Sequence, residues 1–353
     1  MNAPVHAGQR VSFVDFRDPA QLARIEAFVA EMGASLFHRP AWLCAVDRGT
    51  GQKAGGLIVE QLGVITGWLP LTQVRSFLFP PAMVSSGFGV GGGICAENDA
   101  ATKALARAVE KMAVQHSYAS VELRGGPVPE GWRSWDDKHC NFERDLAEDD
   151  EAELLAIPRK ARAEVRKGLK LGLDVKIGRG KDDLAAHYTV YSESVRNLGT
   201  PVFPKALFSE MLAAFPDSSD ILTILKDGAP IASVLSFYHN GAVMPFWGGG
   251  TYAARAARAN ELMYYELMLN ARKRGMKRFD FGRSKTGSGP YHFKKNWGFE
   301  PQPMTYAEWT APGAEARDVD PTSEEYSRKI ELWKKLPLPV ANTIGPFIAR
   351  GLA

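Results

Sequence analysis

Three consecutive strand-like segments joined by two tight turn signals lie in the second half of the chain, and they restrict its fold more than any other feature. The segments begin at Ile221, Ile231 and Ala242, and each is rich in β-branched or aromatic residues. Lys226-Asp-Gly and His239-Asn-Gly separate them, and Asp-Gly and Asn-Gly are the preferred residues of two-residue hairpin turns. We therefore predict an antiparallel meander of these segments.

A helix and a further strand follow the meander. The apolar spacing predicts a helix from about Asn260 to Lys273, and Lys277–Phe281 has the composition of a buried strand. A strand at Leu173–Ile177 and two helices, at about Leu184–Arg196 and Lys205–Ala214, precede the meander. This order predicts an α+β fold in which helices flank a mixed, mostly antiparallel sheet.

The first half shows the same order less clearly. An initial strand and helix lead to strands at Leu57–Glu60 and Trp68–Leu71, and a long helix begins at Asn98 or Asp99. The strand Ala119–Arg124 follows that helix. Two successive units of meander, helix and strand indicate a duplicated architecture, and a single irregular α+β domain is the alternative.

The length of the chain, 353 residues, suffices for two medium-sized cores. We expect a first domain at residues 1–150, a second at residues 151–312 that carries the site, and an amphipathic tail at residues 313–353. The acidic run Asp145–Glu153 marks the join, and we expect it to be solvated.

The charge balance excludes a protein that binds nucleic acid over its whole surface, because the chain has 43 basic and 40 acidic residues and a net charge of +3. Any affinity for anions must be local. We expect no metal site, because the three cysteines, Cys44, Cys95 and Cys140, are too far apart for a metal-binding motif. With no signal peptide and no apolar run of about 18 residues, the expected location is the cytoplasm, either free or peripheral at the inner membrane face.

The stretch from Asp280 to Gly298 is the most informative for function. A buried strand ends at Phe281, a glycine-rich loop follows, and Ser288 can cap a short helix after it. Loop amides and a helix N-terminus bind anions, and Lys285 lies nearby in the sequence. By composition alone, a plain connecting loop is the alternative.

These residues also carry a family resemblance. The helix ending at Gly275, the strand closing in Asp280-Phe-Gly282 and the block Gly289-Pro-Tyr-His-Phe-Lys-Lys-Asn-Trp-Gly298 resemble the closing half of the FemAB-type transferases. That resemblance implies two tandem domains of the GNAT acyltransferase fold and the addition of amino acids to cell-wall precursors from aminoacyl-tRNA.

A narrower likeness extends over about Phe37 to Trp309. The segments Phe37–Trp42, Arg159–Arg166 and Ser194–Pro204 are similar to those of the FemAB-like proteins that accompany exosortase/PEP-CTERM and exopolysaccharide systems. The resemblance thus implies an acyl- or aminoacyltransferase that forms an amide on a cell-envelope or exopolysaccharide precursor.

Candidate catalytic residues lie in the last block. In cell-wall members of the family, a lysine that follows phenylalanine lies at the reacting centre, and the resemblance places Lys294 there. A positive charge at this point would stabilise the oxyanion formed when an amine attacks an ester or thioester. Asp280 and Arg283 could take a proton from the amine and bind an acidic group. A solvated helix lysine and a simple strand-end carboxylate are the alternatives.

A basic helix, from Pro158 to Leu171, is the first candidate substrate-binding element. Its cations are more numerous than a solvated face usually holds, which favours a phosphate-bearing partner: tRNA, a nucleotide-linked sugar, a lipid pyrophosphate or coenzyme A. A soluble surface helix is the alternative. The residues that we expect to contact substrate are Arg159, Lys160, Arg162, Arg166, Phe246, Trp247, Tyr252, Lys285, Tyr291 and Phe293.

The acyl donor remains open between aminoacyl-tRNA and an acyl-coenzyme A, and we expect no tightly bound cofactor. Ala256–Glu261 stands where a standard coenzyme A enzyme has a glycine-containing motif, which disfavours a standard acetyl-coenzyme A site. Two other functions fit the sequence: an acyl-coenzyme A-dependent N-acyltransferase of an amino sugar, and a non-catalytic adaptor of a polysaccharide system.

The tail beyond Ser323 predicts a helix with Tyr326, Ile330 and Trp333 on one face, followed by apolar, proline-broken segments. Such a tail either lies on a membrane surface near a lipid-linked acceptor or docks against the domains. The sequence leaves the oligomeric state open.

Overall fold

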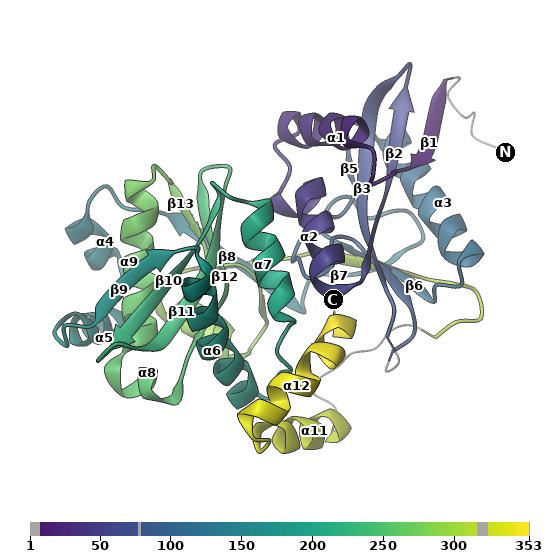
Figure 1. Cartoon of the computed structure of the whole chain (residues 1–353). Helices are drawn as coiled ribbons and strands as arrows, with labels where there is room; N and C mark the ends of the chain where they lie inside the picture. Colours follow the sequence, from purple (N-terminus) through teal and green to yellow (C-terminus); the bar gives the residue numbers. More distant parts are fainter. Residues whose placement is uncertain (1–7, 77–78, 316–323, 353) are drawn as a thin grey trace. The chain divides into compact units, whose positions relative to one another are not determined.

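The computed structural model describes residues 8–76, 79–315 and 324–352. The described residues form two compact units (Figure 1). The first unit comprises those within Met1–Asp136, Met304–Val319 and Ile348–Ala353, and the second comprises those within Asp137–Pro303 and Asp320–Phe347.

The first unit is a mixed sheet with helices. Its sheet has the order β1-β2-β3-β4-β6-β16-β7, and β5 pairs with β3. The Asn98 side chain accepts a hydrogen bond from the amide of Ala101, which makes Asn98 the cap of α3. The elements are β1 (Gln9–Phe13), α1 (Pro19–Glu31), α2 (Pro40–Thr50), β2 (Lys53–Gln61), β3 (Val64–Val74), β4 (Ala82–Val84), β5 (Cys95–Ala96), α3 (Asp99–Gln115), β6 (Ser120–Arg124), β7 (Arg133–Trp135) and β16 (Tyr306–Thr310).

The second unit repeats this plan around a sheet of order β14-β8-β13-β12-β11-β10-β9, with β15 paired to β8. Helices α6 and α7 lie on one side of the sheet, and α4 and α9 lie on the other (Figure 1). The elements are β8 (His139–Asp145), α4 (Asp150–Ala156), α5 (Arg159–Leu169), β9 (Asp174–Gly178), α6 (Lys181–Leu198), α7 (Lys205–Ala214), β10 (Ser219–Lys226), β11 (Ala229–His239), β12 (Ala242–Gly250), α8 (Tyr252–Ala257), α9 (Ala259–Lys273), β13 (Arg278–Asp280), β14 (Ser284–Lys285), α10 (Gly289–Asn296), β15 (Pro301–Pro303) and α11 (Glu324–Lys334), followed by α12 (Leu338–Ala349).

The predicted meander is present as β10, β11 and β12. Asp227 and Gly228 form the first turn, and Asn240 and Gly241 form the second. All of them have positive φ angles, between 47° and 78°, which suits hairpin turns that follow the twist of the strands. The turn chemistry therefore fixes the register of the strands that carry the site.

The sequence-predicted limits of the domains differ from those of the two units. Strand β8 lies before residue 151 but pairs with β13 in the second sheet, and β16 lies before residue 313 but pairs with β6 in the first. A strand that pairs with the sheet of the other unit does not change the composition of the sequence near residue 151 or near residue 313. The expected solvation of Asp145–Glu153 is wrong for Glu153, which is buried in α4 and forms an ion pair with Arg144.

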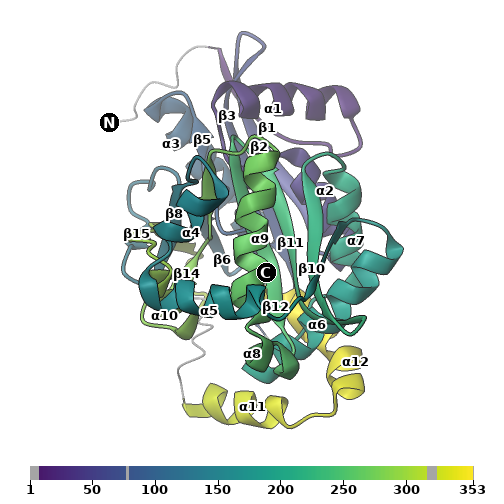
Figure 2. The ribbon, with the colours of Figure 1, turned by 90° about the vertical axis from the view of Figure 1, so that its left-hand side faces the viewer.

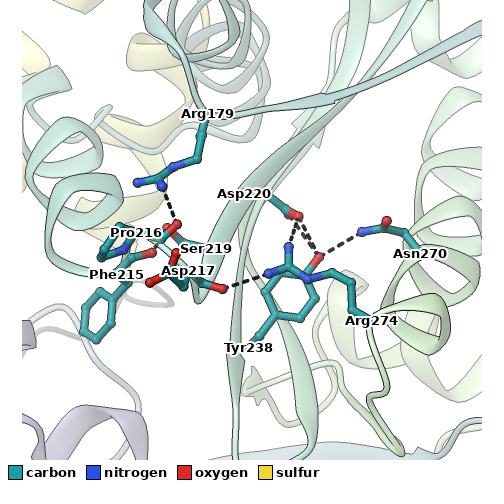
Figure 3. A network of polar contacts seen from close by, with 9 residues as sticks. All are labelled: Arg179, Phe215, Pro216, Asp217, Ser219, Asp220, Tyr238, Asn270 and Arg274. Atoms are coloured by element: carbon teal, nitrogen blue, oxygen red, sulfur yellow. Dashed lines mark hydrogen bonds and ion pairs between the residues drawn. The ribbon is translucent and has the colours of Figure 1, made fainter.

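A polar network closes one end of the second sheet, where β10 begins and β11 ends (Figure 3). The Tyr238 hydroxyl donates to the Asp220 carboxylate at 2.9 Å, and Asn270 donates to that hydroxyl oxygen at 3.1 Å. Arg274 donates to Asp220 at 2.7 Å and to the carbonyl of Asp217 at 2.8 Å. Burial raises the pKa of Asp220. The network ties the end of α9 to the amino end of β10.

Candidate functional site

Strands β12 and β13 separate toward their carboxyl ends. Their parallel pairing reaches Val243 on β12 and Phe279 on β13. Beyond that point Asp280 pairs with Glu143 of β8, and β12 continues to Gly250 beside β11. The two neighbouring strands thus diverge within the sheet.

A β-bulge in β12 increases the divergence. Leu235 of β11 faces Trp247, whereas the next residue, Ser236, faces Pro245, so Phe246 is the extra residue. A bulged strand bends and twists more strongly, and its extra residue leaves the regular ladder. Backbone N–H and C=O groups near Phe246 therefore lie outside the regular β11–β12 ladder, close to the place where β12 and β13 separate.

Glycines at the end of β12 allow helices to approach closely. A Cβ atom on Gly249 would lie 2.1 Å from the Ser194 Oγ of α6, and one on Gly250 would lie 2.5 Å from the Asn260 side chain of α9. Any larger residue would push these helices away from the strand. Glycine at these positions therefore sets the spacing of α6, β12 and α9 around the divergence.

Lys294 projects from α10 to the end of β13. Its side chain is only 7% exposed, and its Nζ atom donates to the carbonyl oxygens of Gly282 at 2.8 Å and Arg283 at 3.1 Å. Nζ also lies 5.4 Å from the ring centroid of Phe142 and 5.5 Å from that of Phe281. Burial lowers the pKa of Lys294 to about 7. The group can therefore change charge near neutral pH.

Asp280 and Arg283 lie beside this lysine. The Asp280 carboxylate accepts a hydrogen bond from the Gly282 amide at 2.9 Å, and burial raises its pKa, although hydrogen bonds from Gly282 and Asn141 oppose that change. The negative charge of Asp280 raises the pKa of Lys294, and the positive charge of Arg283 lowers it. The structure thus brings the three candidate catalytic residues together.

Helix α10 begins where the sequence predicts it. The Ser288 hydroxyl accepts a hydrogen bond from the Tyr291 amide at 3.4 Å, and Pro290 occupies the first turn. Within the next turn the helix returns Lys294 to the loop that follows β13. The local capping residues therefore determine where the lysine lies.

Aromatic rings gather on the α6–α7 side of the divergence. Trp247 contacts Phe246 with ring centroids 4.7 Å apart, Phe208 of α7 at 5.2 Å, and Phe203 of the α6–α7 loop at 6.5 Å. Phe246 and Trp247 were predicted from the sequence, whereas Phe203 and Phe208 were missed. Phe203 precedes Pro204, and Phe208 lies in the first turn of the predicted helix Lys205–Ala214, so the available signal was two aromatic residues close to a helix start.

The remaining residues expected to contact substrate fall into two groups. Tyr291 and Phe293 pack against the hydrophobic core of the second unit, so part of each ring supports the fold. Tyr252 is exposed at the start of α8, where its amide donates to Glu193 at 2.9 Å, and Lys285 is exposed in β14. Tyr252 and Lys285 are therefore exposed, whereas Tyr291 and Phe293 are partly buried.

The basic helix predicted from the sequence is α5. Arg159, Lys160 and Arg166 are exposed, and Arg162 donates to the carbonyl oxygen of Leu155 at 3.1 Å. Three of the four predicted cations are therefore turned toward solvent, whereas Arg162 also braces the turn between α4 and α5.

Helix α5 lies between the segments that follow β12 and β13 (Figure 2). At its start, Pro158 lies against Gly298 after α10; at its end, Gly168 lies against the carbonyl of Arg258, between α8 and α9. Glu164 forms an ion pair with Arg258 at 2.7 Å. The basic helix is thus attached to both borders of the strand divergence.

The first unit fills the corresponding place with its own chain. Strands β4 and β6 pair in parallel up to Val84, and the chain from Ser85 to Gly93 then returns to β6. Arg124 donates to the carbonyl of Gly89 at 2.7 Å, and the Gly93 amide donates to the carbonyl of Arg124 at 3.1 Å. The backbone groups at the end of β6 are therefore bonded by the first unit's own loop, and we take the second unit as the candidate site.

Among residues 8–76, 79–315 and 324–352, no cluster of histidine, cysteine and acidic side chains is suited to hold a metal ion. Within the same part of the chain, no helix has the length and apolar character that crossing a bilayer requires.

Comparison with known families and structures agrees with this geometry. Residues 158–295 match the family model described as an acetyltransferase (GNAT) domain, a segment that runs from the start of α5 through Lys294. A comparison with curated proteins finds no match.

Solved structures resemble nearly the whole chain. FemX is 14% identical, with a TM-score of 0.64 over 84% of this chain and 96% of FemX. A tandem GNAT protein from the clavulanic acid biosynthesis pathway is 13% identical, with a TM-score of 0.57 over 87% of this chain and 100% of that protein. L-PGS from Bacillus licheniformis is 13% identical, with a TM-score of 0.54 over 95% of this chain and 96% of that chain. These likenesses confirm the predicted fold of two tandem GNAT-like domains.

Proposed function

We propose that this chain transfers an acyl or aminoacyl group onto an amine of a cell-envelope or exopolysaccharide precursor. The chain has the tandem GNAT fold, and its residues 158–295 match the GNAT acetyltransferase domain. One observation carries the proposal: the divergence of β12 and β13 has the bulge at Phe246 on one border and Lys294 with Asp280 on the other. A carbonyl between the strands would meet polar groups from both borders.

The chemistry needs an amine, a carbonyl and a place for one proton. The neutral amine attacks the carbonyl carbon of an ester or thioester, a C–N bond forms, and the carbonyl oxygen becomes an oxyanion. Lys294, when protonated, lies at the end of β13 where it can stabilise that charge. Asp280, whose pKa burial raises, takes the amine proton and returns it to the departing oxygen or sulfur as the C–O or C–S bond breaks.

Helix α5 supplies the binding site for the phosphates of a substrate. Its exposed cations, Arg159, Lys160 and Arg166, lie on an element attached to both borders of the divergence. Arginine pairs well with phosphate oxygens, and several cations on one helix give binding that weakens as salt rises. The resemblance to FemAB-type transferases favours aminoacyl-tRNA as the donor, and acyl-coenzyme A would use the same cations.

The acceptor enters from the α6–α7 side in this proposal. There Phe203, Phe246 and Trp247 offer ring faces and edges beside the bulge. Asp280 follows Phe279 on β13, and because Phe279 belongs to the core on the α9 side, the Asp280 side chain points to the α6–α7 side. An amine placed there lies beside its proton acceptor. The acceptor belongs to an envelope or exopolysaccharide precursor, free or lipid-linked, and the motifs shared with exosortase/PEP-CTERM-associated proteins favour an exopolysaccharide.

Thermal unfolding in the presence of each donor class tests the proposal. A ligand that binds the native protein raises its melting temperature, so charged tRNA and acyl-coenzyme A can be compared directly, with uncharged tRNA and free coenzyme A as controls. We expect one acylated donor to stabilise the chain and to be consumed when amine acceptors are added.

The competing functions predict other results. Consumption of acyl-coenzyme A with an amino sugar alone would favour the N-acyltransferase of amino sugars. Stabilisation by exopolysaccharide without consumption of any donor would contradict catalysis and favour an adaptor. In cells, deletion of the gene should remove an N-linked substituent from the exported polysaccharide, and an unchanged polysaccharide would contradict the proposed acceptor.

A further inference from the structure

Strand β9 forms one edge of the second sheet (Figure 1). In the part of the chain that the structure describes, only β10 pairs with β9, from Asp174 opposite Leu225 to Gly178 opposite Ile221, without a shift of register. The outer side of such a strand presents backbone N–H and C=O groups to which a further strand can pair. Proline or a bulge would prevent that pairing, and β9 contains neither.

Apolar side chains on the core side of β9 are exposed at this edge. Val175 lies opposite Ile224 of β10, and Ile177 lies opposite Leu222, so both share a face with the core on the α9 side. Val175 and Ile177 are nevertheless 39% and 43% exposed, and Leu171, just before the strand, is 53% exposed. Exposed apolar side chains on the core side of an edge strand favour a neighbouring strand that continues the sheet.

The other face of β9 carries one charge of each sign. Asp174 and Lys176 are both exposed there, and the ammonium group of Lys176 forms an ion pair with Asp183 of α6 at 2.8 Å. A lysine often protects an edge strand against pairing, because a second strand would bury or repel its charge. Here Asp183 holds the lysine on the α6 side of the sheet and balances its charge, which weakens that protection.

The sequence of β9 is complementary to a second copy of itself. Two copies can run antiparallel with Val175 opposite its own equivalent. Leu173 then faces Ile177 of the other copy on the α9 side of the sheet, and these are two apolar residues. On the α6 side Asp174 faces Lys176 of the other copy, and opposite charges in such cross-strand positions stabilise a sheet.

The same charges disfavour the neighbouring registers. A shift by two residues would place Lys176 opposite Lys176 in one direction and Asp174 opposite Asp174 in the other. A shift by one residue would turn the apolar residues of one copy to the α6 side of the other. The pattern of β9 therefore selects one register, and a second copy of this chain is the partner that it fits.

We propose that this chain forms a homodimer in which β9 of one copy pairs antiparallel with β9 of the other, with the two-fold axis at Val175. The sheets of the two second units then become one continuous sheet. Because the two-fold axis of an antiparallel pair is perpendicular to the sheet, helices on one face in each copy lie on one face of the joined sheet. Helix α5 packs on the α9 side through Ala161 and Val165, so the dimer presents both sets of α5 cations on the same face. The dimer does not depend on the proposed acyl transfer.

Exchange of the two charges tests the register with the full chain. Sedimentation at a series of concentrations gives the dissociation constant of the dimer. Asp174→Lys makes each cross-strand charge pair two cations, and Lys176→Asp makes each pair two acids, so either change should raise the dissociation constant about tenfold or more. An equimolar mixture of the two variants restores both opposite-charge pairs, and it should form a heterodimer about as tight as the unmodified dimer.

The mixture also serves as a control for folding. Lys176→Asp loses the ion pair with Asp183, so its melting temperature is measured first. Association that is lost in each variant alone and regained in the mixture requires direct contact between the two altered positions, because neither chain is repaired by the other. A mixture that stays monomeric would contradict the proposed register.

A cross-link locates the two-fold axis. Residues opposite each other in an antiparallel pair have Cα atoms about 4.5–5.5 Å apart, which is within the range of a disulfide. Val175→Cys should therefore form a disulfide-linked dimer under mild oxidation. Val128→Cys is the matched control, because Val128 of the first unit is 40% exposed and Val175 is 39% exposed, and it should stay unlinked. A monomer throughout the micromolar range would overturn the proposal. So would a dimer that neither charge variant weakens, because its interface would lie elsewhere.

Discussion

The Nζ atom of Lys294 lies 2.8 Å from the carbonyl oxygen of Gly282, which is the second residue after the end of β13. With the second bond to Arg283, two of the three possible N–H directions of the ammonium group are occupied. In the protonated state one N–H remains for a substrate oxygen, and in the neutral state a lone pair takes its place. The lysine can therefore stabilise an oxyanion only while it is protonated.

Replacement of Lys294 tests its part in acyl transfer. We expect Lys294→Met to lower kcat by at least about tenfold, because the variant lacks the charge beside the oxyanion. The folded state should remain, since methionine fills a buried site without a charge. Turnover with the acceptor is the measurement, and Lys295→Met, at the exposed neighbouring position, is the matched control. Wild-type turnover by Lys294→Met would remove this lysine from the mechanism.

The pH dependence of turnover distinguishes a cation from a base. The pKa of Lys294 is about 7, so the protonated fraction falls as pH rises through that value. If the charge stabilises the oxyanion, the single-turnover rate at saturating acceptor should fall as pH rises through about 7. This pH dependence should be absent in Lys294→Met. A rate that instead rises through pH 7 in the unmodified protein alone would assign the proton-accepting role to Lys294 and not to Asp280.

The same pKa leads to a prediction about stability. The unfolded chain keeps this lysine protonated up to about pH 10.5, whereas the folded chain releases the proton near pH 7. Between these values the unfolded state binds more protons, so the free energy of unfolding should rise by about 1.4 kcal/mol per pH unit relative to Lys294→Met. Urea unfolding of both proteins across pH 7 to about 9 measures this difference. Parallel profiles would show that the pKa of the folded state is not lowered.

Local signals in the sequence predicted much of the second unit. The Asp-Gly and Asn-Gly turns fixed the meander, and the helix at Lys205–Ala214 is found at the predicted residues. What could not be predicted is pairing between distant segments. Nothing in the composition of His139–Asp145 indicates that it becomes the neighbour of β13, because strand order depends on packing energies summed over the whole sheet.

The candidate site shows the same division. The family resemblance and the capping residues predicted Lys294 as a site residue, and the structure brings it to Asp280. Neither could show that the lysine is buried with a pKa of about 7, since one of the rings beside its Nζ atom belongs to Phe142, about 150 positions earlier in the chain. Of the tail, the Tyr326 side chain lies outside the described residues.

Helix α5 offers a test of phosphate recognition. Replacement of Arg159, Lys160 and Arg166 with glutamine should weaken donor binding and reduce the slope of log affinity against log salt by about one unit for each phosphate that the variant no longer binds. Lys103, Arg107 and Lys111 are exposed at regular spacing on α3 and serve as a matched control. Equal salt slopes in the two triple variants would make α5 an ordinary solvated helix.

The network in Figure 3 predicts a loss of stability without a loss of chemistry. Tyr238→Phe removes the donor to Asp220 and the acceptor for Asn270 in a buried place, which should lower the free energy of unfolding by about 1–3 kcal/mol. Because Tyr238 faces Val243, which precedes the bulge at Phe246, and none of the network's residues is a candidate site residue, kcat at a temperature where the variant is folded should be unchanged. A large fall in kcat with an unchanged melting temperature would place the network in the reaction.

The contact between Gly249 and Ser194 predicts how the spacing of α6 and β12 affects the site. In Gly249→Ala the new Cβ would lie 2.1 Å from the serine Oγ and 2.7 Å from its Cβ, so strand and helix must move apart. We expect a loss of stability of about 1–3 kcal/mol, and also a lower kcat, because Trp247 and the bulge lie on the displaced strand. Ser194→Ala removes only the oxygen and leaves the Cβ contact, so it should not rescue Gly249→Ala. Ser194→Gly removes both atoms and should restore part of the stability and of kcat, although a glycine within a helix costs roughly 1 kcal/mol. A double-mutant cycle on unfolding and on kcat measures the coupling, and additive effects of the two substitutions would show that this contact does not set the geometry of the diverging strands.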